Sequence, residues 1–157
     1  MIAFLWLLVI LILLTFAIGM ALSFYFTRRA RLGDVFSPDE YGLEFESIEL
    51  KTRDKLTLRG VWIPAAEADK AIVILHGHGS SYDFDVYRAA SLHEAGFNVL
   101  LFDFRTHGRS DGKRMTFGYE ERWDVQAAKL AKMFIDNFKR FEAGVSPDVK
   151  AAGPRAQ

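Results

Sequence analysis

The chain has 157 residues, 20 basic and 20 acidic side chains, and no cysteine, so its formal net charge is zero. Zero net charge argues against a nucleic-acid partner, and the absence of cysteine removes disulfides, thiol nucleophiles and cysteine-ligated metal sites. Half of the residues are hydrophobic, which excludes a chain that is disordered throughout.

The first 26 residues carry no charged side chain and are almost entirely apolar. A membrane-spanning helix needs about 20 such residues. The segment lacks a basic N-terminal region and a small-residue cleavage site, so residues 1–27 predict a retained single-pass anchor in the lipid bilayer rather than a cleaved signal peptide. A buried core helix is the alternative, but such helices rarely run this long without a charge.

Basic residues predict the orientation of this anchor. Arg28, Arg29 and Arg31 follow the apolar run and no basic residue precedes it. Because basic residues stay on the cytoplasmic side, we expect the N-terminus outside and the globular part in the cytoplasm.

The globular part begins with a linker and a hairpin. Residues 28–42 carry turn formers without periodicity and are expected to link the anchor to a domain at 43–141. Residues 43–51 and 56–64 alternate between polar and apolar and predict a β-hairpin.

Two strand–helix units are expected next. The apolar run 71–75 predicts a strand buried on both faces, followed by a helix over about 82–95. Residues 98–104 predict the next strand, and a helix over about 118–141 follows a loop rich in glycine and charge. Helical spacing predicts the inward residues of both helices, and Thr116 is the expected N-cap of the second. These inward residues are Val86, Ala89, Ala90 and Leu92 in the first helix and Trp123, Ala127, Leu130, Ala131, Phe134, Phe138 and Phe141 in the second.

This order predicts an α/β fold with a mostly parallel sheet. Ligands of such sheets sit beyond the carboxyl ends of the strands, where the glycine-rich loops 76–81 and 105–112 would lie. Glycines directly after a strand allow a sharp turn and leave backbone N–H groups unblocked, which can stabilise a developing oxyanion. The tail 142–157 consists of small residues, glycine and proline, and is expected to be disordered.

Three segments in order carry a family resemblance: HGHGSS at 76–81, DFRTHGRSDG at 103–112 and GYEERWDVQAA at 118–128. They resemble the turns after the third and fourth strands, and the following helix, of α/β hydrolases, in particular lysophospholipase-like and monoacylglycerol-lipase-like serine hydrolases. The resemblance covers about residues 43–138. It implies hydrolysis of acyl esters, as by an esterase or lipase, on a lipid or a small molecule, without a cofactor.

The resemblance also implies roles for individual residues. The backbone N–H of His78 would belong to the oxyanion hole, in a turn shaped by His76, Gly77 and Gly79. A second set would form a loop that supports the site: Asp103, Arg105, His107, Gly108 and Ser110. The sequence departs from the family at Thr106, where a glycine is usual, and a conformation with positive φ would be less comfortable there.

The pattern G-x-S-x-G occurs at 108–112, but its context does not fit a nucleophile. A nucleophile elbow joins a strand directly to a helix, whereas Ser110 follows the predicted strand by six residues. We therefore expect Ser110 to be a structural loop residue. His76 and His78 raise the alternative of a metal site, but the longer H-x-H-x-D-H pattern is absent, and we expect no metal.

In the family the nucleophile follows on a later strand, and no such strand, serine motif or histidine follows the second helix here. The sequence therefore predicts the first half of a hydrolase sheet, apparently truncated, with nucleophile and catalytic histidine absent. Two functions stay open: a membrane-anchored ester hydrolase, and a non-catalytic membrane-tethered fragment or interaction module.

Overall fold

The computed structural model describes residues 2–28 and 36–142, and for 132–142 it describes the backbone alone. Most of the expected linker and the tail 143–157 lie outside the described residues. So do the side chains of Phe134, Phe138 and Phe141.

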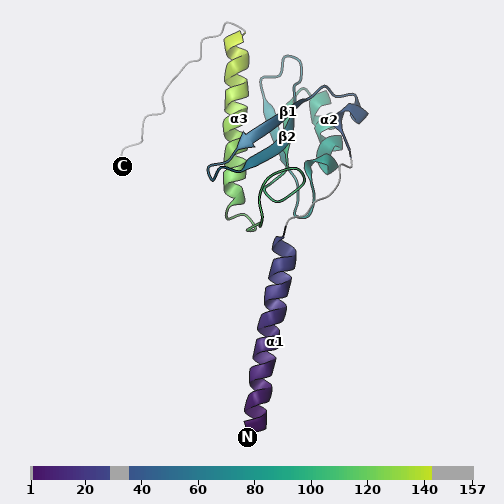
Figure 1. The fold of residues 1–157 in the computed structure, drawn as a ribbon. Coiled ribbons are helices and arrows are strands. Elements are labelled where there is room, and N and C mark those ends of the chain that lie inside the picture. The colour runs from purple at the N-terminus through teal and green to yellow at the C-terminus, as the bar shows by residue number, and fades with distance from the viewer. Residues whose placement is uncertain (1, 29–35, 143–157) are drawn as a thin grey trace, which may run out of the picture.

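The N-terminal helix α1 (Ile2–Thr27) stands apart from the rest of the molecule (Figure 1). None of its residues is buried, so it is not a core helix. Among the described helices, α1 alone is long and apolar enough to cross a membrane, although a signal sequence would have the same character.

Four strands form one sheet in the order β1-β2-β4-β3. They are β1 (Glu46–Lys51), β2 (Thr57–Ile63), β3 (Ala71–Leu75) and β4 (Asn98–Phe102). β1 pairs with β2, and β2 with β4, in antiparallel register, whereas β3 and β4 are parallel. The expectation of a mostly parallel sheet is therefore wrong for the described strands. Strand β2 of the hairpin pairs with β4 in antiparallel register, so only one of the three strand pairs is parallel.

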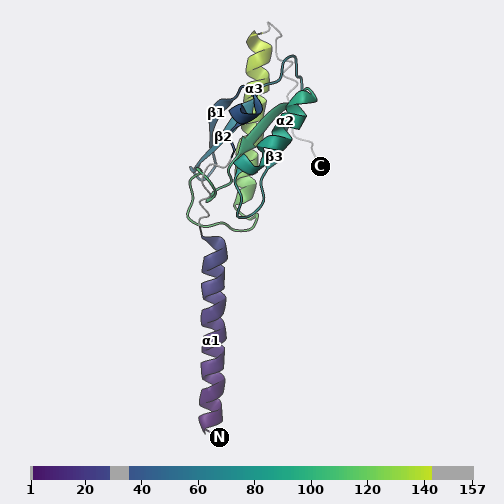
Figure 2. The same cartoon turned by 90° about the vertical axis from the view of Figure 1, so that its right-hand side faces the viewer.

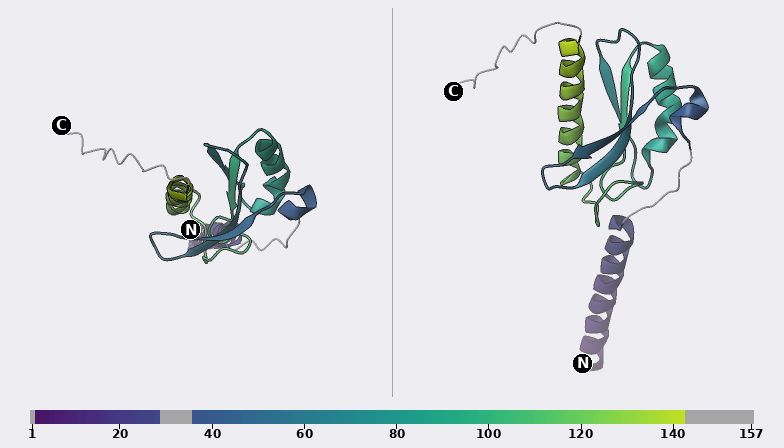
Figure 3. Two further views of the ribbon diagram at one scale, coloured as in Figure 1. Left: turned by 90° about the horizontal axis from the view of Figure 1, so that it is seen from above. Right: turned by 45° about the horizontal axis from the view of Figure 1, so that its top comes forward.

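Helices cover both faces of this sheet, which gives three layers (Figure 3). On one face, Val61, Val99 and Leu101 pack beneath helix α2 (Val86–Glu94). On the other, Trp62 and Leu100 pack beneath helix α3 (Glu121–Glu142). Alternate residues of β2 and β4 thus serve opposite layers, as the period of a strand requires.

The helices begin later than the sequence predicts. Residues Tyr82–Asp85 form a 3-10 helix before α2, whose inward residues are those expected. α3 begins at Glu121, whose carboxylate accepts hydrogen bonds from the backbone N–H and the hydroxyl of Thr116 across the preceding turn. Within α3, Ala127 is buried as expected, but Leu130 is 49% exposed, and the prediction that it faces inward is wrong. The inward row includes Asp124 instead, which pairs with a buried arginine.

Candidate active site

Two loops meet at one end of the sheet because β3 and β4 are parallel neighbours. β3 ends at Leu75 and continues into the turn 76–81, and β4 ends at Phe102 and continues into the loop 103–118. Figure 2 shows this end of the domain next to the end of α1. The sequence-predicted site residues are therefore brought together.

Two histidines fasten the loops to each other. The Phe104 N–H donates to His76 Nε2 (3.0 Å), and the Gly79 N–H donates to His107 Nε2 (3.2 Å). The Nδ1 of His76 contacts the Gly77 carbonyl and that of His107 contacts the Arg105 carbonyl, at 2.8 and 2.9 Å. These partners fix a neutral tautomer for both rings, with Nδ1 donating and Nε2 accepting. Neither ring has a nitrogen left for a metal or a substrate proton.

No described group of three His, Asp or Glu side chains could hold a metal ion. The rings of His78 and His107 lie 5.8 Å apart between centroids, but His107 is already engaged on both nitrogens.

Asp103 is the buried centre of the second loop. Its carboxylate accepts the Tyr82 N–H at 2.9 Å and the Arg109 N–H at 3.0 Å. Its carbonyl accepts the hydroxyl of Ser110 (2.6 Å), and that hydroxyl in turn accepts the Arg59 N–H. Ser110 is fully buried, and through these two hydrogen bonds its hydroxyl joins the loop to β2.

Arg105 is buried among three carboxylates. It binds Asp124, Asp54 and Glu120 at 2.7 to 2.9 Å. Burial raises the pKa of the Asp124 carboxyl above its ordinary value, although the bonds from Arg105 oppose this. No sequence signal indicated this cluster, because Asp54 lies far along the chain from the two other acids, which stand near the start of a predicted helix. The adjacent Thr106 has φ +67°, in the left-handed region that favours glycine.

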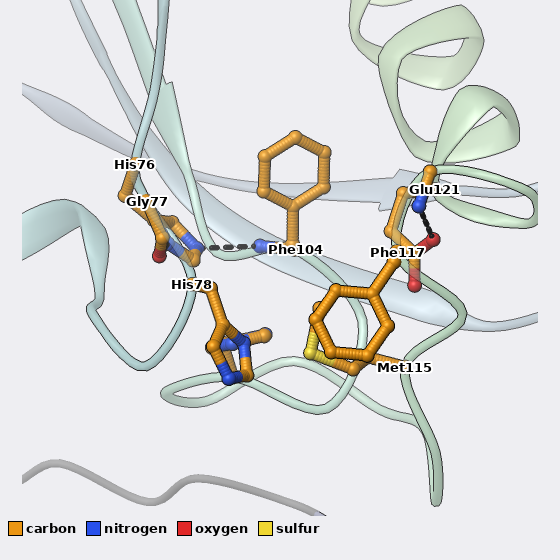
Figure 4. Close-up of a pocket in the computed structure, with 9 residues that line it drawn as sticks. His76, Gly77, His78, Phe104, Met115, Phe117 and Glu121 are labelled. Atoms are coloured by element: carbon orange, nitrogen blue, oxygen red, sulfur yellow. Dashed lines mark hydrogen bonds between the residues drawn. The ribbon is translucent and has the colours of Figure 1, made fainter. Parts of the chain in front are cut away.

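A pocket of about 260 Å³ opens beside the turn 76–81 (Figure 4). Its walls are Phe104, Met115 and Phe117, with the ring of His78 packed 5.4 Å from that of Phe117. Burial by itself raises the pKa of the lining Glu121, but bonds from Thr116 and from the Gly118 N–H hold the pKa of that carboxyl below its ordinary value. The Glu121 carboxylate is therefore engaged by hydrogen bonds from the loop that precedes α3.

The backbone N–H of His78 is one of the polar groups beside the pocket. Among the described residues it donates no hydrogen bond. By contrast, the Ser80 N–H in the same turn donates to the Gly77 carbonyl. An unpaired N–H at the rim of an apolar pocket can donate to an anionic oxygen. The lining by Met115 and Phe117 gave no sequence signal, since both lie in an aperiodic loop.

We expect His76 to make the fold sensitive to acid. Burial lowers the pKa of His76 below 6.5, so the unfolded chain binds its proton first as the pH falls. The stabilisation is complete above pH 6.5 and is lost as the pH falls through the lowered value of the folded state. Denaturant unfolding in detergent should show a smaller acid-induced loss of free energy for His76→Gln than for the wild type, and equal losses would contradict this.

A family model described as serine aminopeptidase, S33, matches residues 66–141. An esterase of Pyrococcus furiosus is similar in structure, with a TM-score of 0.61 and 34% identity over 73% of this chain and 44% of its own. The uncharacterised protein YfhR of Escherichia coli is 33% identical over 99 residues, or 60% of this chain and 34% of YfhR. The chain thus spans less than half the length of these relatives.

A different relative matches a short stretch. The ATP-dependent phosphoenolpyruvate carboxykinase of Parvibaculum lavamentivorans is 56% identical over 43 residues, which is 27% of this chain and 8% of that enzyme. Because the match covers so small a part of that enzyme, it does not support a carboxykinase site in this chain. The mixed α/β architecture with a partial sheet is that of the hydrolases.

Proposed function

This chain belongs to the α/β-hydrolase family over residues 66–141, and from that premise we propose that it is a membrane-anchored, hydrolase-like protein whose site binds the acyl group of an ester. α1 is the anchor, and the arginine that follows it, Arg28, favours a cytoplasmic domain. The similarity to an esterase supports ester chemistry.

The open N–H of His78 carries the proposal. In acyl transfer the carbonyl oxygen gains negative charge as the carbon becomes tetrahedral, and a rigid N–H aimed at it lowers the barrier. The turn is held rigid from both sides by the bonds of His76 and His107. Phe104, Met115 and Phe117 would accept the apolar part of the substrate.

A stable anion tests this role without requiring turnover. Octanoate carries an apolar tail and a charged oxygen, so we expect it to shift the His78 amide resonance saturably in NMR spectra of the full chain in detergent. Octanol, matched in length but uncharged, should leave this resonance in place. Because the donor is backbone, His78→Ala should keep octanoate affinity within about two-fold, a change below 1 kcal/mol. Loss of binding in His78→Ala would show that the side chain, not the N–H, is the ligand.

The second candidate is a non-catalytic membrane-tethered module. It is favoured by the hydroxyl of Ser110, which is buried and bonded to Asp103 and Arg59, and by the two histidines whose nitrogens are already used. We expect a fluorophosphonate serine probe not to label Ser110. Strong labelling that Ser110→Ala abolishes would contradict this and make Ser110 the nucleophile.

A further inference from the structure

The loop that lines the pocket is joined to the end of the apolar helix. The Met115 N–H donates to the Thr27 carbonyl at 3.0 Å, and the backbones of Arg28 and Arg114 pair in an antiparallel bridge. In Figures 1 and 2, α1 leaves the domain at the end where this loop lies. The position of α1 therefore sets the position of the loop.

The length of α1 places that junction at the membrane surface if α1 spans the bilayer, as proposed above. Its 26 residues, at about 1.5 Å per residue, extend about 39 Å. The hydrocarbon core is about 30 Å thick, and about 40–45 Å with the headgroup layers. Thr27 then lies among the headgroups, and Met115 lies one hydrogen bond away from it.

The side chains around Met115 suit this depth. Lys113 and Arg114 are exposed, and cationic side chains there attract anionic headgroups. Phe117 and Tyr119 expose 64% and 65% of their surface, and aromatic rings are enriched at membrane interfaces. Phe117 also holds φ at +50°, a conformation that is costly for a bulky residue.

We propose that residues 113–119 form a membrane-contacting loop, with Lys113 and Arg114 on lipid phosphates and the rings of Phe117 and Tyr119 in the interface. Met115, Phe117 and Gly118 belong both to this loop and to the wall of the pocket. The pocket consequently opens at the bilayer surface, and its apolar ligand enters from the lipid. This inference rests on the anchor in the proposed function, but not on catalysis.

The chain has no cysteine, so single cysteines can carry an environment-sensitive fluorophore. The full chain would be reconstituted in vesicles of phosphatidylcholine and phosphatidylglycerol that contain nitroxide-labelled lipid. Tyr119→Cys and Phe117→Cys report on the loop and Leu13→Cys on the anchor. Glu94 is exposed at the C-terminal end of α2, and Glu94→Cys is the matched control.

We expect blue-shifted, nitroxide-quenched emission at positions 13, 117 and 119, with quenching at 117 and 119 strongest for nitroxides near the headgroups, and none at 94. The double variant Lys113→Glu, Arg114→Glu should lose quenching at 119. Quenching at 13 with water-like emission at 117 and 119 would overturn the loop proposal and leave the anchor intact. Water-like emission at 13 would overturn the anchor and the loop together, whereas octanoate binding tests the catalytic role separately.

Discussion

An Arg105→Met variant is expected to lose about 3–5 kcal/mol of folding free energy, because removing one partner of a buried ion pair leaves the other charge uncompensated. Asp124 is fully buried and receives three hydrogen bonds from the side chain of Arg105. Methionine fills a similar space but cannot donate. The loss should be measured by denaturant unfolding in detergent.

Two comparisons identify the uncompensated charge as the cause. Glu120 also binds Arg105, but its side chain is 38% exposed, so Glu120→Gln should cost less than about 1 kcal/mol. Adding Asp124→Asn to Arg105→Met should recover most of the loss, because the amide oxygen can still accept the Arg105 backbone N–H without a charge.

The same explanation predicts a dependence on pH. Burial already raises the pKa of Asp124, and removing Arg105 removes the main opposing influence. A carboxyl whose pKa is raised by folding binds its proton more readily in the folded state, so the deficit of Arg105→Met should shrink as the pH falls from neutral toward the ordinary value of 3.8. A deficit independent of pH would mean that lost packing alone is responsible.

Local sequence patterns predicted where helices and strands form better than they predicted which elements pair with one another. The presence of a strand at 71–75 and the inward side of α2 follow from runs and periods of apolar residues, which neighbouring positions determine. The prediction that this strand is buried on both faces is wrong, because β3 lies at the edge of the described sheet and its residues are half-buried or exposed. The antiparallel contact of β2 with β4 does not follow from either strand's own sequence. Leu130 was misplaced for a related reason: the inward row of α3 is set by the bond of Asp124 to Arg105, 19 residues away in the chain.

The candidate site divides in the same way. Glycine-rich turns after two apolar strands indicated its place, and the parallel pairing of β3 with β4 brings them together. The bonds that use both nitrogens of His76 and His107 come from backbone groups 28 residues away or from the adjoining turn, and no spacing rule contains them. The junction of Thr27 with Met115 joins segments that the sequence treated as separate domains.

Gly108→Ala is expected to cost about 2.5–5 kcal/mol, because two penalties add at this position. Gly108 has φ +43°, and the left-handed conformation costs a residue with a side chain about 1–2 kcal/mol. An added methyl group would also overlap the Asp103 carboxylate, which is held by the N–H groups of Tyr82 and Arg109. The carboxylate must move and lose at least one charge-assisted bond, worth about 1.5–3 kcal/mol.

The turn 76–81 supplies matched controls for each penalty. Gly79 has φ +72° with open space around it, so Gly79→Ala should show the conformational cost alone, about 1–2 kcal/mol. Gly77 has open space and no positive φ, so Gly77→Ala should be nearly neutral. If the overlap with Asp103 is the cause, Gly108→Ala should cost about 1.5–3 kcal/mol less in an Asp103→Ala background. Equal costs in both backgrounds would instead assign the whole effect to the backbone, and would mean that Asp103 does not require a glycine beside it.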